Sequence, residues 1–122
     1  MQTSITIEGR IPSKKNSRNV FSRGGKLFNI PSKKYKEWHS VATLQISEFE
    51  NLQIEEVSSI DLKFYAPDRR SADLTNKAES VLDLLVDNGV IIDDNWFVLK
   101  NVNLYFQGVD KERPRCEVII HS

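Results

Sequence analysis

The sequence has little of what marks an exported, membrane-spanning or disordered chain. Its one cysteine, Cys116, cannot form an internal disulfide and nothing indicates export, so we expect a reducing cytoplasm. No apolar run approaches the roughly 20 residues of a membrane-spanning helix, and the N-terminus has no signal-peptide layout. With 122 residues, 39% hydrophobic and 28% charged, the composition predicts one soluble globular domain spanning residues 1–122.

The residue sets that usually carry nucleophilic or nucleotide-dependent catalysis are also lacking. His39 and His121 are isolated, and His39 is expected on the surface of a helix rather than at a metal. Cys116 follows the alternation of a strand and is expected in the core. No Gly-rich phosphate loop occurs, since Arg23 to Lys26 indicates a turn. The carboxylates are therefore the remaining candidates for chemistry.

The net charge is zero, but the charges are unevenly distributed along the chain. Residues 10–36 contain nine basic residues and no acid: Arg10, Lys14, Lys15, Arg18, Arg23, Lys26, Lys33, Lys34 and Lys36. Residues 73–94 contain six acids, Asp73, Glu79, Asp83, Asp87, Asp93 and Asp94, against one base, Lys77. This separation suits a polyanion-binding surface beside metal-seeking carboxylates; the alternative is ordinary solvated surface charge.

Hydrophobic periodicity predicts an α/β fold in which a small mixed sheet is combined with two helices. Ser32 is expected to cap the first helix, and Asn88-Gly89 to end the second. Between the first strand and the first helix we expect a long basic loop, residues 9–31, with room for a short strand near 26–30. The elements follow the order β-α-β-α-β-β: strands at 3–8, 59–66, 98–106 and 115–120, and helices at 32–50 and 73–87.

The second helix separates an apolar stripe from a polar face. Leu74, Ala78, Val81 and Leu85 form the expected core stripe. Asp73, Asn76, Ser80 and Asp83 fall on the opposite side, flanked by Lys77 and Glu79. One or two Mg²⁺ ions held by such carboxylates can activate water, neutralise a phosphate and stabilise a leaving oxygen. Spacing alone leaves a simpler alternative open, in which Asp73 caps the helix and Asp93-Asp94 forms a polar turn.

The segment RRSADLTNKAESVLDLLVDNGVIIDD, residues 69–94, resembles the central motif of the RusA-type Holliday-junction resolvases. That motif has basic residues, Asp-x-Asp-Asn, a helix ending near Asp-x-Leu, a Gly-containing turn, a hydrophobic pair and Asp-Asp. Asp73, Asn76, Asp83, Gly89 and Asp93-Asp94 fall at the family's separations without a gap. IPSKKNS at 11–17 resembles the family's Pro-Ser-x-x-Asn loop, and residues 32–35 its Ser-x-x-Tyr element.

The resemblance implies a small α/β homodimer, here a phage-like variant, that cuts four-way DNA junctions or other branched DNA with Mg²⁺, or alternatively Mn²⁺. Asp73 is then the first catalytic carboxylate and Asp94 the last. This sequence departs from the family at Thr75, where the family has a second acid, and at Glu79, where it has a lysine. Either Glu79 replaces the lost carboxylate and Lys77 the lost cation, or the site is degenerate and the protein only binds DNA.

On the first alternative the catalytic residues are Asp73, Asp94, Glu79 and Lys77, and the metal ligands are Asp73, Asp94 and Glu79. The expected DNA-binding residues are Lys14, Lys15, Arg69 and Arg70 near the carboxylates, Lys33 and Lys34 along the first helix, and Asn76. Trp96 is expected in the core or at a dimer interface, or else stacked at an opened junction. A third possibility is an interaction protein whose acids are merely solvated.

Overall fold

The computed structural model describes residues 1–13, 18–23 and 26–122, with side chains outside 14–31. A four-stranded mixed sheet and two helices form a small single-domain α/β fold, which confirms the predicted class. The elements in chain order are β1 (Gln2–Glu8), β2 (Arg18–Arg23), β3 (Lys26–Pro31), α1 (Lys33–Gln45), the 3₁₀ helix η1 (Ser47–Phe49), β4 (Ser59–Ala66), α2 (Leu74–Asp87), β5 (Val102–Val109) and β6 (Arg115–His121).

The main sheet has the strand order β1-β6-β4-β5. β6 is antiparallel to both of its neighbours, whereas β4 and β5 are parallel. Parallel neighbours need a crossover connection, and α2 lies in that connection. On β4, Asp61 accepts a hydrogen bond from Asn103 of β5 at 2.9 Å and contacts the His121 ring of β6 at 3.0 Å, which joins the three strands by side chains.

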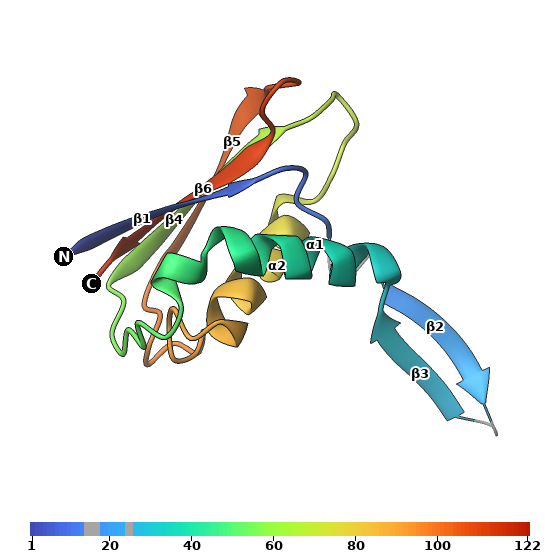
Figure 1. Ribbon diagram of the computed structural model, residues 1–122, viewed down its shortest axis with the longest axis horizontal. Coiled ribbons are helices and arrows are strands. Elements are labelled where there is room, and N and C mark those ends of the chain that lie inside the picture. The colour runs from blue at the N-terminus through green and yellow to red at the C-terminus, as the bar shows by residue number, and fades with distance from the viewer. Residues whose placement is uncertain (14–17, 24–25) are drawn as a thin grey trace.

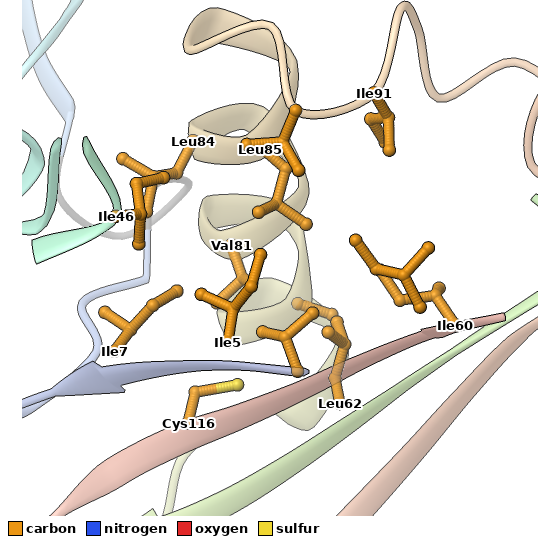
Figure 2. Close-up of a cluster of buried hydrophobic side chains, with 14 of the residues drawn as sticks. Ile5, Ile7, Ile46, Ile60, Leu62, Val81, Leu84, Leu85, Ile91 and Cys116 are labelled. Atoms are coloured by element: carbon orange, nitrogen blue, oxygen red, sulfur yellow. The ribbon is translucent and has the colours of Figure 1, made fainter. Parts of the chain in front are cut away.

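The helices pack one face of the sheet, and the core lies between the two layers (Figure 1). Figure 2 shows Val81, Leu84 and Leu85 of α2 facing Ile5, Ile7 and Leu62 of the strands, all buried. Cys116 is buried in β6, as predicted. The expected polar face of α2 was wrong at Ser80, which is fully buried, because a neighbouring segment covers it. In the described part of the chain, no helix is long and apolar enough to cross a membrane.

The predicted start of the first helix and the predicted end of the second are confirmed. The Ser32 hydroxyl accepts a hydrogen bond from the Tyr35 amide at 3.2 Å at the start of α1. α2 ends at Asp87, and Gly89 follows with φ +66°, where a Cβ atom would lie 2.6 Å from the Gln53 side chain. The prediction that α1 continues to residue 50 was wrong: it ends at Gln45, and the chain tightens into η1.

The short strand expected near 26–30 is confirmed as β3, whereas two other predictions for the strands were wrong in detail. β3 has an unexpected antiparallel partner, β2, and the hairpin β2–β3 projects beyond the N-terminal end of α1 in Figure 1. The strand expected at 98–106 is instead Val102–Val109, because Val98 and Leu99 are buried in the turn that Asn95 starts. Gly108 therefore lies within β5, and β4 separates β5 from β6 in the sheet.

Candidate catalytic and nucleic-acid-binding site

Asp73 occupies the N-cap position of α2, but its side chain does not cap the helix. Its backbone is extended (φ −78°, ψ 120°), and the carboxylate makes no hydrogen bond to the first-turn amides. Instead, Oδ2 accepts a hydrogen bond from the Asn76 side-chain amide at 3.1 Å. The simple capping alternative therefore does not hold. Asp73 is exposed, and Asn76, which the sequence predicted on the same face of the helix, orients its carboxylate.

Two α2 side chains hold the segment that follows β1. Lys77 donates from Nζ to the carbonyl oxygen of Ile11 at 2.5 Å, and Ser80 donates from Oγ to the carbonyl oxygen of Pro12 at 2.7 Å. Pro12 and Ser13 are the Pro-Ser pair of the expected loop, so its start is fixed against the helix that carries Asp73. The predicted DNA-binding residues Lys14 and Lys15 come next and lie outside the described residues.

Lys77 lies in a positively charged environment. Burial lowers the pKa of its ammonium group, and the neighbouring charges of Arg10, Lys34 and Arg70 lower it further. Asp68 acts in the opposite direction. Such a group gains from the approach of an anion. The structure therefore brings Lys77, predicted as a catalytic cation, near two predicted DNA-binding residues, Lys34 and Arg70.

A cleft of about 760 Å³ opens beside these cations. Its lining comes from the segment after β1, the last residues of β4, the β4–α2 connection, the first turns of α2 and the last residues of β5. The charged lining residues are Arg10, Asp68, Arg69, Arg70 and Lys77. Asp68 pairs with Arg70 at 2.9 Å and with Arg10 at 3.7 Å, and the bonds from Arg70 lower the pKa of Asp68. Four bases face one acid among the described lining residues, so the cleft favours anions.

Asp94 lies in a turn after α2 that is well fixed by hydrogen bonds. Asp93 accepts from the Asp94 amide and from the Asn95 side chain, both at 2.8 Å, and these bonds lower the pKa of Asp93. The pKa of Asp94 is raised, first by partial desolvation of its carboxyl group and then by Asp93 and by Asp83 of α2. Repelling carboxylates of this kind attract a cation.

The predicted metal ligands come from three places on and after α2. Asp73 is at the N-terminal end of α2, Glu79 is exposed along the helix, and Asp94 lies in the turn that follows it. Among the described residues, no three His, Cys, Asp or Glu side chains lie close enough together to hold a metal. The catalytic roles of Asp73, Asp94, Glu79 and Lys77 stay predictions.

Trp96 follows this acidic turn and is not in the core. Its exposed fraction is 78%, and that of Phe97, which the sequence reading did not single out, is 76%. The two rings contact edge to face with centroids 6.3 Å apart. Lys33, predicted to contact DNA, lies at the start of α1 and pairs with Glu37 at 3.9 Å.

Comparison with known proteins shows what this chain is similar to. No protein-family model matches the chain. The chain is similar to the crossover junction endodeoxyribonuclease RusA of Aquifex aeolicus (strain VF5), with 31% identity over 87 residues. The matched residues cover 70% of this chain and 68% of that protein.

Proposed function

The chain belongs to the RusA family of crossover junction endodeoxyribonucleases, and we propose that it is a Mg²⁺-dependent endonuclease that resolves four-way or other branched DNA by phosphodiester hydrolysis. The observation that carries the proposal is the similarity to the Aquifex aeolicus enzyme over 70% of the chain. The Asp73 carboxylate supports it, because this group does not cap α2 and a carboxylate bonded to the first-turn amides would be a poor metal ligand.

The cations provide the attraction that a cluster of acids needs before it can act on DNA. Arg10, Arg69, Arg70 and Lys77 line one cleft, and Lys34 adds its charge from α1. Such residues neutralise phosphates and position the duplex without reading its sequence. We place Lys14, Lys15 and Lys33 in the same role.

Asp94 and Asp73 are the proposed metal ligands, with Glu79 as a third. Mg²⁺ commonly takes only one or two protein carboxylates and completes its shell with water and substrate phosphate, so the absence of a three-carboxylate cluster among the described residues is compatible with it. Mn²⁺ is the alternative ion. When bound, the ion supplies charge neutralisation at the scissile phosphate. Asp93 and Asn95 fix the turn that presents Asp94, and Asn76 orients Asp73.

We propose that the protein acts as a homodimer, since cutting two opposed strands needs two sites and C₂ pairing is the commonest way to supply them. From the sequence, either the strands at 98–106 and 115–120 or the second helix could form the interface, but β6 lies inside the sheet and is not available as an edge strand. The exposed side chains of Ile92, Trp96 and Phe97 form a better candidate surface, since the two rings contact each other and contiguous exposed apolar groups mark interaction sites.

A cleavage assay tests the proposal. End-labelled four-way junction, flap and linear duplex DNA are incubated with the purified protein in Mg²⁺, Mn²⁺ or EDTA. We expect metal-dependent cutting of branched DNA, loss of cutting in Asp94→Asn, and wild-type cutting in Glu55→Gln, which removes an exposed carboxylate elsewhere. Salt-sensitive binding without cutting under any metal would instead identify a DNA-binding module, and the absence of binding would identify a protein that does not act on nucleic acid.

A further inference from the structure

The cleft described above has an apolar part that its cations do not explain. Phe64 of β4 and Phe106 of β5 are register partners on the parallel pair, and both line the cleft. Phe64 is buried, whereas Phe106 is 62% exposed. A large aromatic ring is therefore presented to solvent inside a concave surface rather than packed in the core.

The backbone of β5 leaves space beside this ring. The β4–β5 register shifts between Phe64 and Tyr65, so that Gln107 is left without a partner and Gly108 pairs with Tyr65. Gly108 has φ +112°, and nothing lies within 4 Å of where its Cβ would be. Most side chains would be strained in this conformation, and glycine adds no side chain to the lining of the cleft.

Basic groups surround the same space. Arg10, Arg69, Arg70 and Lys77 line the cleft together with Phe106. Asp68 is already shared between Arg70 and Arg10, and Lys77 is repelled by its basic neighbours. An aromatic face next to an excess of positive charge matches a ligand that joins a flat base to a phosphate.

We propose that this cleft binds one unpaired nucleotide of a DNA strand, with the base against Phe106 and its phosphate at the Arg69, Arg70 and Lys77 side. A volume of about 760 Å³ is in the range of pockets that hold small molecules, and so is large enough for one nucleotide. The inference rests on the proposed action on branched DNA, in which bases at the branch point can leave the stack. An unstacked base of this kind is what the cleft would hold.

The test compares a base-bearing strand with a base-free strand. Fluorescence anisotropy measures binding of the full-length protein, in EDTA, to a labelled single strand and to an abasic strand of the same length and phosphate number. Phe106→Ala should weaken binding to the base-bearing strand by about 5- to 150-fold, the range that base–aromatic stacking gives, and leave binding to the abasic strand unchanged. Phe106→Trp should keep the preference for bases.

Two control variants separate stacking from charge and from general damage. Tyr105→Ala removes the neighbouring ring on β5, which is 44% exposed and does not line the cleft, and should change neither affinity. Arg69→Gln removes one exposed cation of the cleft and should weaken binding to both strands alike. Deoxyadenosine monophosphate is added as a competitor, and we expect it to displace the strand only poorly.

The inference would be overturned if Phe106→Ala lost affinity equally for the base-bearing and the abasic strand, or lost affinity for neither. It would also be overturned if Phe106→Ala converted a dimer into a monomer, because Phe106 would then be a contact between two copies of the chain. Displacement of the strand by trace deoxyadenosine monophosphate would also overturn it, since the cleft would then be a free-nucleotide site. Junction cutting is measured separately with the wild type. Cutting without base preference refutes only this inference, and base preference without cutting refutes only the proposed function.

Discussion

Lys77 and Ser80 offer a way to separate the anchoring of a DNA-binding segment from its charge. Both donate to carbonyl groups of the segment after β1, Lys77 to Ile11 at 2.5 Å and Ser80 to Pro12 at 2.7 Å. Only Lys77 carries a charge, and only Lys77 lines the cationic cleft. We therefore compare Lys77→Met, which keeps the aliphatic stem, with Ser80→Ala.

The two changes differ in their expected cost in stability. Ser80→Ala removes a buried hydroxyl donor and leaves the Pro12 carbonyl without that bond, which costs about 1–3 kcal/mol of unfolding free energy. Lys77→Met also loses a bond, from a charged donor, but it relieves the repulsion from Arg10, Lys34 and Arg70. We therefore expect Lys77→Met to cost less, about 1 kcal/mol.

The assays are urea unfolding and DNA binding measured across a salt series. If Lys77 contacts one phosphate, Lys77→Met lowers the slope of log affinity against log salt by about 0.9 on duplex DNA. Ser80→Ala should lower the affinity through displacement of the segment that leads to Lys14 and Lys15, with the slope less affected. Lys77→Arg serves as the charge-conserving control.

An unchanged salt slope in Lys77→Met would refute the phosphate role and leave Lys77 as an anchor. A stability loss in Lys77→Met larger than in Ser80→Ala would refute the electrostatic argument, because the repulsion removed with the ammonium group should offset part of the lost hydrogen bond.

The remaining predictions concern other parts of the molecule. Asp94→Asn should abolish cutting and leave junction binding equal or tighter in a gel shift, because removing a negative charge near phosphates reduces repulsion; near-wild-type cutting would contradict the assignment. If Glu79 replaces the acid missing at Thr75, Glu79→Gln should cost as much cutting as Asp73→Asn; a silent Glu79→Gln with a more active Thr75→Asp would show the compensation idea to be wrong. Asp61→Ala should lose about 1–2 kcal/mol in denaturant unfolding at neutral pH, because both carboxylate oxygens have partners. Since those hydrogen bonds lower the pKa of Asp61 from 3.8, its contribution is fully present above that value, and the deficit should shrink as the pH falls below it. Trp96→Ala should weaken the proposed dimer, and light scattering that finds only a 14.0 kDa monomer in the wild type at micromolar concentration would count against dimerisation.

Local signals in the sequence predicted the elements whose boundaries depend on neighbouring residues. The hydroxyl of Ser32 and the glycine at 89 act within one turn of their own helices, so both ends could be read directly. The position of β5 depends on its register with β4 and on the burial of Val98 and Leu99, which are long-range facts. Alternating residues from 98 onward therefore predicted a strand four residues too early.

The site shows the same division. Asp73 and Asn76 are three residues apart, so their pairing on a helix surface was predictable from spacing. The burial of Ser80 was not, because its cover is Pro12, 68 residues away in sequence. The cleft combines Arg10, Lys77 and Phe106, which no pattern in the sequence connects. They meet because β4 pairs in parallel with β5 and α2 crosses between them.

This arrangement bears on how the departures from the family motif are to be understood. The compensation hypothesis has two parts, a carboxylate from Glu79 and a cation from Lys77. The Lys77 ammonium is bonded to Ile11 and surrounded by Arg10 and Arg70, so it is placed to hold phosphate in the cleft. Glu79 lies two residues further along α2, about 200° around the helix axis from Lys77, so the two side chains leave the helix on different sides. The carboxylate and the cation of the hypothesis are therefore separable in space. This separation requires two results. Glu79→Gln should lose cutting. Lys77→Met should show a smaller salt slope in DNA binding but keep its cutting rate at saturating DNA.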